Sequence, residues 1–320
     1  QMIYLIKRIY LLLMISSKYD LLVVVGDVIP VTVSWLTGLP VVTYLVAYSS
    51  HYEGRLKLPW PCANCLSSDR FLKIYTRDNL TADDLKNSFL GKVEFVGNPF
   101  MDPFLTNQEI FSQHKKRLGI LPGSRMPEVG NNLCVILRVI DYLSNLKCEY
   151  SDISLDVALV SCLDDNILKK IVTPTGWRLH YQVDNHNPLK LIKNQSIVNI
   201  YRNSFVKVVN SSNVLICMAG TATEQAALLG KLIVQIEGKG PQFNASFAEA
   251  QRRLLGPGIY CANGSVEEDI HMRKTCKIIL DLLEKSYGDS LFKIKPNKEK
   301  LTKNKSEVIS EIMAKSITNS

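Results

Sequence analysis

The sequence predicts an α/β protein built from two doubly wound domains in tandem. Short apolar runs rich in β-branched residues recur along the chain and end at glycine or other turn residues, as the buried strands of a parallel sheet do. Segments with helical spacing separate many of these runs, and strands that alternate with helices form a sheet covered on both faces. At 320 residues, the chain is long enough for each domain to bury its own core.

The first segment of the chain is strongly apolar, but Lys7 and Arg8 interrupt it. The uninterrupted run is shorter than the roughly 20 residues needed to cross a bilayer. A cleaved signal sequence is one interpretation, and a buried or membrane-facing helix of the first domain fits the pattern better. Because the sequence begins with Gln1 rather than Met, we expect it to be an N-terminally incomplete fragment.

The first domain is predicted to span residues 1–110. Thr81 and Asp84 have the spacing of a capping box at the start of one of its helices. Residues 98–109 contain two prolines and little periodicity, which places the domain boundary just after them. Four buried strands are expected before that boundary, within 21–27, 40–46, 72–76 and 93–99.

The second domain is predicted to span residues 111–290 and to end with a long helix at about 267–286. Its first helix is indicated by apolar residues at helical spacing, namely Val129, Leu133, Ile136, Leu137, Ile140 and Leu143. Strands are expected before that helix and within 153–160, 177–183, 196–201, 213–220 and 231–238.

The net charge of +8 favours acidic partners such as phosphorylated substrates or anionic lipid surfaces. Residues 291–320 are predicted to be a basic tail, either simply solvated or in specific contact with phosphate or membrane. No zinc-finger spacing and no aromatic-rich basic strand is present, so nucleic acid is disfavoured as a partner. Six lysines crowd this tail, namely Lys293, Lys295, Lys298, Lys300, Lys303 and Lys305.

The eight cysteines are scattered through a chain too large to need disulfides, which predicts a reducing, cytoplasmic location. Cys62 and Cys65 form a CxxC pair without a second pair at zinc-ligand spacing. Packing in a loop explains this pair better than a zinc or redox site.

The segment LPGSRMPE (121–128) has the composition of an anion-binding turn. Gly123 lets a ligand approach the backbone, and the following helix presents free N–H groups at its positive end. Arg125 adds a fork of donors that suits phosphate oxygens. A tight turn with a surface arginine is the alternative interpretation.

A second turn of this kind lies in MAGTATEQAALLGK (218–231), where a strand runs into Gly220. Thr221 and Glu224 fit a capping box, so helix stability alone can explain them. The same turn offers hydroxyl groups and amides to a ligand, and Glu224 has the chemistry to hold ribose hydroxyls. Further along, residues 238–256 combine glycines with polar side chains, which indicates either a ligand contact or a solvated helix face.

Taken together, these segments resemble lipid-A-disaccharide synthase, and still more a group of bacterial proteins related to that enzyme. The resemblance rests on LPGSRMPE, followed about a hundred residues later by MAGTATEQAALLGK, and on GKGPQFNASFAEAQRRLLGPG. In the first half of the chain, GDVIP, LKLPW and FVGNPFMD also look like that group. The likeness extends from Asp20 to about Asn263, but the family's first strand and glycine-rich loop are absent.

This resemblance implies a GT-B fold, in which two Rossmann-like domains enclose an interdomain cleft. It implies an inverting hexosyltransferase that needs no metal ion or other cofactor. A UDP-sugar donor would bind the C-terminal domain, and a lipid-linked or membrane-borne acceptor would bind the N-terminal one, at the inner face of the cytoplasmic membrane. The implied donor-binding residues are Gly123, Ser124, Arg125, Gly220, Thr221, Thr223, Glu224, Gln242, Asn244 and Glu249.

The resemblance also offers Asp27, at the end of a predicted strand, as the base that deprotonates the acceptor. A structural aspartate that caps the next turn is the alternative. Three functions stay open, in this order: a glycosyltransferase, a sugar-nucleotide epimerase or hydrolase, and a non-catalytic protein that binds nucleotide sugars. The fold alone does not choose among them.

Overall fold

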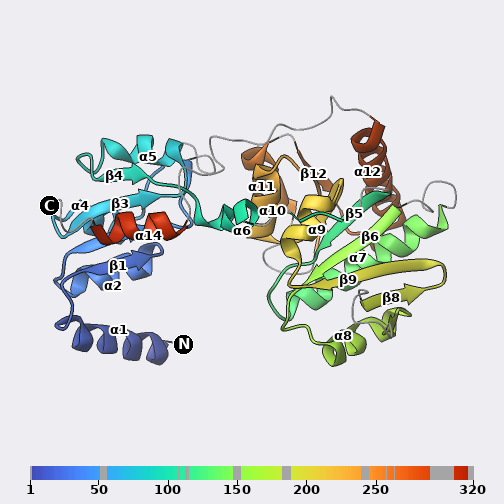
Figure 1. The fold of residues 1–320 in the computed structure, drawn as a ribbon, viewed down its shortest axis with the longest axis horizontal. Coiled ribbons are helices and arrows are strands. Elements are labelled where there is room, and N and C mark those ends of the chain that lie inside the picture. Colours follow the sequence, from blue (N-terminus) through green and yellow to red (C-terminus); the bar gives the residue numbers. More distant parts are fainter. Residues whose placement is uncertain are drawn as a thin grey trace. The chain divides into compact units, whose positions relative to one another are not determined.

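The chain folds into two compact α/β units (Figure 1). Gln1–Asp102 together with Lys298–Ser320 form unit 1, and Pro103–Asn297 form unit 2. The computed structural model describes residues 2–50, 56–106, 109–111, 115–146, 153–181, 189–238, 245–256, 258–262, 264–288 and 306–315. Each unit contains a largely parallel sheet with helices packed against it, so the predicted fold class is confirmed.

Unit 1 contains a parallel sheet in the order β1-β2-β3-β4, one strand at each of the four expected places. The strands are β1 (Leu22–Val25), β2 (Val41–Tyr44), β3 (Phe71–Thr76) and β4 (Val93–Phe95). Helices α2 (Val28–Leu36), α4 (Trp60–Ser67) and α5 (Asn79–Lys86) contribute to the core on one face of this sheet. That core includes Val31, Val41, Cys62, Leu66, Phe71, Ile74 and Leu85.

The other face of this sheet is covered by α14 (Ser306–Lys315), close to the C-terminal end of the chain. Ile309 and Met313 of α14 are buried against Val42 and Tyr44 of β2, whereas Val41 belongs to the opposite core, because successive strand residues point to opposite faces. Helix α14 is therefore a structural layer, not part of a solvated tail. The six clustered lysines lie outside the described residues.

The unit boundary also differs from the expected one. Residues up to Asp102 belong to unit 1, and the chain enters unit 2 at Pro103, before the expected position after residue 110. The short elements here are the 3₁₀ turn η1 (Pro99–Met101) and helix α6 (Asp102–Thr106). Phe104 of α6 packs edge-on against Phe205 of unit 2, with ring centroids 5.6 Å apart, which holds this segment in unit 2.

Helix α1 (Met2–Ser16) forms at the expected apolar segment, but the described side chains of its apolar residues are largely exposed. Tyr10 and Met14 are 64% and 58% exposed, so of the two expected environments, buried or membrane-facing, the buried one is wrong. Within the described ranges, no helix combines the length and the apolar character needed to span a bilayer.

The start of α5 differs from the predicted capping box. Asp78 is the N-cap residue, and its side chain accepts a hydrogen bond from the amide of Thr81 at 2.8 Å. Thr81 lies inside the helix, where its hydroxyl accepts from the amide of Ser50 at 2.8 Å. Asp84 accepts from the amide of Leu56 at 2.6 Å. Both predicted capping residues therefore hold the loop that follows β2.

Unit 2 is built on an eight-stranded sheet in the order β12-β11-β10-β5-β6-β9-β8-β7. The strands are β5 (Lys116–Leu121), β6 (Ile153–Leu159), β7 (Arg178–His180), β8 (Leu189–Lys193), β9 (Ser196–Arg202), β10 (Val214–Cys217), β11 (Leu232–Ile236) and β12 (Ile259–Ala262). All neighbours from β12 to β9 are parallel.

Two strands of this sheet, β8 and β12, are absent from the sequence prediction. The two-residue turn Asn194–Gln195 joins β8 to β9 as an antiparallel hairpin, with Asn194 at φ 52°. The sheet is therefore mixed at this edge, not wholly parallel as expected.

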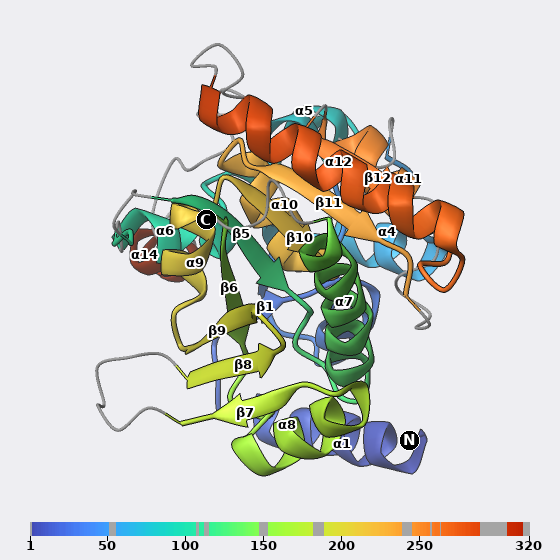
Figure 2. The ribbon, with the colours of Figure 1, turned by 90° about the vertical axis from the view of Figure 1, so that its right-hand side faces the viewer.

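Helices cover both faces of the unit 2 sheet, as Figure 2 shows. One core brings together α7 (Glu128–Asn145), α8 (Asp165–Val172) and α12 (Asp269–Gly288). The 3₁₀ turn η2 (Thr173–Thr175) follows α8. The opposite face carries α9 (Phe205–Ser211), α10 (Gly220–Leu228) and α11 (Ala245–Leu255).

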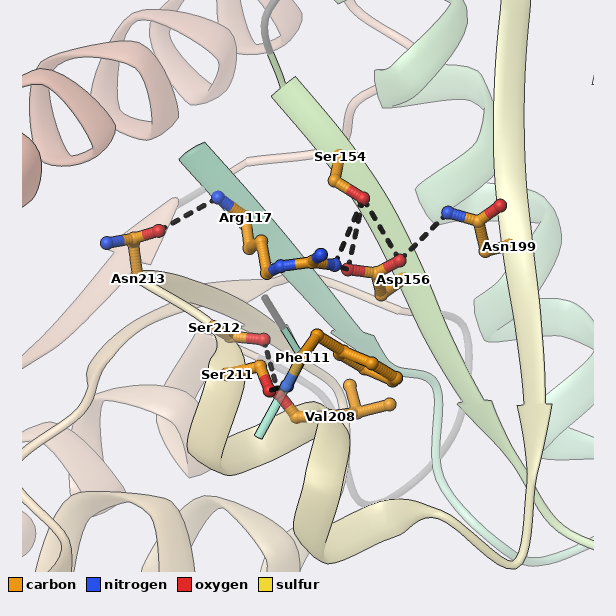
Figure 3. A network of polar contacts seen from close by, with 9 residues as sticks. All are labelled: Phe111, Arg117, Ser154, Asp156, Asn199, Val208, Ser211, Ser212 and Asn213. Carbon is orange, nitrogen blue, oxygen red and sulfur yellow. Dashed lines mark hydrogen bonds and ion pairs between the residues drawn. The ribbon is translucent and has the colours of Figure 1, made fainter. Parts of the chain in front are cut away.

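A network of polar contacts lies on the face of the sheet that α9 covers (Figure 3). Arg117 of β5 and Asp156 of β6 form an ion pair with a 2.6 Å nitrogen–oxygen distance, and Asp156 is 1% exposed. Asn199 donates to the same carboxylate at 2.9 Å. Phe111 lies 4.9 Å from the guanidinium of Arg117 and 4.5 Å from the ring of Tyr201. Burial, together with the charge of Asp156, raises the pKa of Tyr201 to about 12, so this phenol stays neutral.

We expect Ile309→Ala to lower the free energy of unfolding by about 2 kcal/mol or more, because it leaves a cavity between α14 and the sheet. Urea denaturation measures the free energy of unfolding, and hydrogen exchange of the α14 amides reports on the stability of that helix. Glu311→Ala changes an exposed residue of the same helix and should alter stability by no more than about 0.5 kcal/mol. Equal effects of the two variants would show that α14 does not support unit 1.

Candidate functional site

The sheet of unit 2 has a topological switch point between β5 and β10. β5 is the first strand of the unit in sequence, yet it lies between β6 and β10. The chain therefore continues from β5 to β6 on one side of β5 and later returns to form β10 on the other side. Cys217 at the end of β10 is level with Leu121 at the end of β5. Ligands of open α/β sheets bind beyond the carboxyl ends of the strands at such a point.

The turn after β5 is the predicted LPGSR segment. Gly123 has φ +108°, a conformation that favours glycine. Ser124 and Arg125 are exposed, and the guanidinium of Arg125 makes no hydrogen bond or ion pair with the residues that the structure describes. Helix α7 begins at Glu128, and its N-cap residue Pro127 provides no side-chain hydrogen bond. The turn therefore presents a cation without a partner among the described residues, beside a helix N-terminus that has no side-chain cap. The amides of Val129 and Gly130 donate to the backbone carbonyls of Arg125 and Pro127.

The turn after β10 is the predicted MAGT segment. Helix α10 begins at Gly220, and its N-cap residue is Ala219, which provides no side-chain hydrogen bond. The predicted capping box of Thr221 and Glu224 is therefore wrong, because both residues lie inside the helix. A Cβ atom built on Gly220 would meet no atom of the described residues within 4 Å, so these residues leave open space beside the backbone here. This second helix N-terminus also has no side-chain cap.

The polar side chains of the second turn have different environments. Thr221 is exposed, whereas Thr223 is buried and its hydroxyl donates to the carbonyl of Ala219 at 2.5 Å. Thr223 thus stabilises the turn itself. Glu224 is half-buried. Burial raises the pKa of the nearby Cys217 thiol to about 11, so this cysteine stays protonated and is no nucleophile at neutral pH.

The two turns touch each other through backbone and side chain. The amide of Met218 donates to the carbonyl of Leu121 at 2.9 Å, and a Cβ atom on Gly123 would lie 3.1 Å from the carbonyl oxygen of Met218. Asn132 of α7 is buried, and its side chain reaches both turns. Asn132 is not among the residues predicted from the sequence. The sequence feature that could have identified Asn132 is its place, as a polar residue, on the apolar helix face that contains Val129 and Leu133.

Helix α11 borders the second turn. Gln251 donates to the carbonyl of Gly220 at 3.3 Å and accepts a hydrogen bond from Gln235 of β11. Glu249 pairs with Arg252 on the same helix at 2.7 Å, which raises the pKa of the guanidinium and favours the solvated-face interpretation of Glu249. The predicted Gln242 and Asn244 lie outside the described residues.

The carboxyl end of β6 also reaches the first turn. Cys162, in the loop after β6, is exposed, and its thiol donates to the carbonyl of Ser124 at 3.8 Å. Within the described residues, no group of three or more histidine, cysteine, aspartate or glutamate side chains has an arrangement that could hold a metal ion.

Asp27, the predicted base, lies in unit 1 at the end of β1. It precedes α2 but makes no side-chain capping bond to that helix. Its carboxylate accepts from the amide of Val46 at 3.0 Å and from the amide of Ala47 at 3.1 Å. These contacts favour a structural aspartate that fixes the loop after β2. Burial and the charge of Asp27 also raise the pKa of Cys62 to about 12, so this CxxC thiol stays protonated.

No protein-family model matches the chain, and no curated protein matches it. Among solved structures, it is similar to a putative UDP-N-acetylglucosamine 2-epimerase from Listeria monocytogenes, at 12% identity and a TM-score of 0.53, over 99% of this chain and 79% of that one. It is also similar to the spinosyn rhamnosyltransferase SpnG complexed with thymidine diphosphate, at 14% identity and a TM-score of 0.52, over 97% and 77%.

A third similar structure is the UDP-GlcNAc 2-epimerase from Neisseria meningitidis bound to UDP-GlcNAc, at 17% identity and a TM-score of 0.51, over 98% of this chain and 81% of that one. At such identities the likeness shows the fold alone. That fold is the expected GT-B fold of two Rossmann-like units. The finer resemblance to lipid-A-disaccharide synthase, a name that none of these three structures carries, stays a prediction.

We expect Gly123→Ala to lower the free energy of unfolding by about 1 to 3 kcal/mol, because a side chain is strained at φ +108°. Urea denaturation measures the change. Gly220→Ala is the matched control, since its Cβ meets open space at a helix start, and it should be neutral or stabilising by up to about 1 kcal/mol. A neutral Gly123→Ala variant would contradict the tight packing of the two turns.

Proposed function

We propose that the chain binds the diphosphate of a UDP-sugar at the turns after β5 and β10 and transfers the sugar to a lipid-linked or membrane-borne acceptor. The observation that carries this proposal is the pair of helix N-termini without side-chain caps at the switch point, together with the guanidinium of Arg125, which has no partner among the described residues. Helix N-termini favour anions, and arginine binds phosphate through two parallel hydrogen bonds.

The chemistry proposed is a single displacement at the anomeric carbon. The acceptor oxygen forms the new bond as the bond to the diphosphate breaks, UDP leaves with the bonding electrons, and the configuration inverts. Negative charge grows on the leaving diphosphate, so Arg125, the positive N-terminal end of α7 and the first amides of α10 stabilise the transition state more than the ground state. The base that takes the acceptor proton is left unassigned, because the contacts of Asp27 favour a structural role.

A sugar-nucleotide epimerase is the second candidate, because two of the similar structures are named UDP-N-acetylglucosamine 2-epimerases. An epimerase or hydrolase changes the UDP-sugar without an acceptor, whereas a transferase needs one. Incubation of the chain with UDP-N-acetylglucosamine alone, followed by chromatography of the sugar and the nucleotide, separates these two functions. Binding of UDP without any turnover would favour a non-catalytic binding protein.

We expect calorimetry to show that the chain binds UDP more tightly than UMP or ADP, and that Arg125→Ala weakens UDP binding roughly tenfold to a hundredfold. Loss of a charge-assisted phosphate contact has that size. Arg138→Ala is the matched control, since Arg138 is an exposed arginine on the same helix, paired with Glu267. No UDP binding by a folded chain, or equal loss in both variants, would contradict the donor site.

The membrane-borne acceptor is supported by the exposed face of α1. This helix has no acidic residue, carries Lys7 and Arg8, and exposes apolar and aromatic side chains, namely Ile6, Tyr10, Leu11, Leu13, Met14 and Ile15. A basic helix with a large exposed apolar surface binds anionic lipid surfaces. We therefore propose peripheral contact of unit 1 with an anionic membrane.

We expect the chain to sediment with vesicles that contain anionic phosphatidylglycerol and less with neutral phosphatidylcholine vesicles. The double variant Leu11→Glu, Met14→Glu should abolish this binding, because it places charges on the apolar surface of α1. Leu90→Glu alters a leucine of unit 1 that is 87% exposed outside α1 and should bind like the unchanged chain. Equal binding by all three proteins would exclude α1 as the membrane contact.

A further inference from the structure

Asn132 makes two hydrogen bonds that join the turns of the candidate donor site. It is 4% exposed, and its Nδ2 donates to the carbonyl of Pro122 at 2.9 Å and to the carbonyl of Met218 at 3.4 Å. Pro122 belongs to the turn after β5, and Met218 belongs to the turn after β10. One buried side chain therefore connects two turns that are far apart in the sequence.

The chemistry of these contacts requires a neutral amide at this position. Both contacted atoms are carbonyl oxygens, so they accept hydrogen bonds only, and the two N–H groups of Asn132 Nδ2 satisfy them. Side chains of a helix lean toward its N-terminus, which directs this amide back to the turns that precede α7 and α10. A carboxylate of the same shape would repel both oxygens.

Asn132 continues the connection between β5 and β10 beyond the end of their ladder. The backbone bond from the amide of Met218 to the carbonyl of Leu121 links the two segments at the strand ends. One residue further along the chain, at Pro122, the link to Met218 runs through the Asn132 side chain. Gly123 makes room for this close approach, because a Cβ atom there would lie 3.1 Å from the Met218 carbonyl oxygen.

We infer that Asn132 is a positioning residue that holds the two turns at the separation at which both contact one diphosphate. This inference rests on the proposed function of the site. A diphosphate reaches both helix N-termini, whereas a monophosphate needs only one of them. Loss of Asn132 should therefore reduce the preference for UDP over UMP, a quantity that a general loss of stability does not change.

The test is calorimetry of UDP and UMP with the full chain and two matched variants, Asn132→Asp and Asn131→Asp. Both variants add one negative charge to the same turn of α7, but Asn131 is exposed and its side chain makes no hydrogen bond or ion pair with the described residues. We expect Asn132→Asp to weaken UDP binding roughly tenfold to a hundredfold and UMP binding by no more than about threefold. Asn131→Asp should weaken both nucleotides by the same small factor.

Asn132→Leu serves if the buried aspartate prevents folding, because leucine has a similar shape and removes the donors without adding charge. Thermal unfolding of each variant establishes that it is folded before binding is measured. Asn132→Leu should show the same loss of preference for UDP as Asn132→Asp.

The outcomes separate the inference from the proposed function. If the unchanged chain does not bind UDP, the donor site and the inference both fail. If the chain binds UDP and Arg125→Ala weakens that binding, but the ratio of UDP to UMP affinity is unchanged in the folded Asn132 variants, the inference alone fails. Equal weakening of both nucleotides would assign Asn132 a purely structural role and would also overturn the inference.

Discussion

The parallel pairing of β5 with β10 is the constraint on which the candidate site depends. Connections between parallel strands are right-handed, so a sheet that grows from β5 toward both edges places its helices on opposite faces. Helices α7 and α10 therefore start next to each other at one edge of the sheet although they cover different faces. Their N-termini share a direction because their strands do, and the proposed binding of one anion by both helices depends on this shared direction.

The arginines at the two ends of β5 have different environments. Near the start of the strand, Arg117 forms the buried ion pair with Asp156. Removal of one member of such a pair leaves the other charge uncompensated in the interior. Beyond its end, Arg125 is exposed and has no partner among the described residues. Of these two arginines, only Arg125 is available to a ligand. The stability of unit 2 and its proposed anion binding can therefore be changed by separate substitutions.

Unit 1 depends on the return of the chain at α14. The sheet of this unit has an apolar face that includes Val42 and Tyr44, and Ile309 and Met313 cover it. Unit 2 is thus inserted between two parts of unit 1, although unit 1 carries no part of the proposed donor turns. At the carboxyl edge of unit 1, Asp27 accepts hydrogen bonds from the amides of Val46 and Ala47 and so fixes the loop after β2.

The sequence by itself determined most strands and the positions of the two turns after β5 and β10, because periodicity, glycine and helix-start signals are local properties. It did not determine β8 or β12, because these strands are short and weakly patterned. Nor did it determine the docking of α14, because this helix packs against residues that are far away in the sequence. Only the tertiary structure decided that Asn132 joins the turns, since its bond to Met218 spans 86 residues. It also decided that Thr223 donates to the carbonyl of Ala219 in its own turn, and that Asp27 accepts hydrogen bonds from the loop after β2. Hydrogen bonds of this kind depend on which segments meet in space, and no local pattern of residues encodes that.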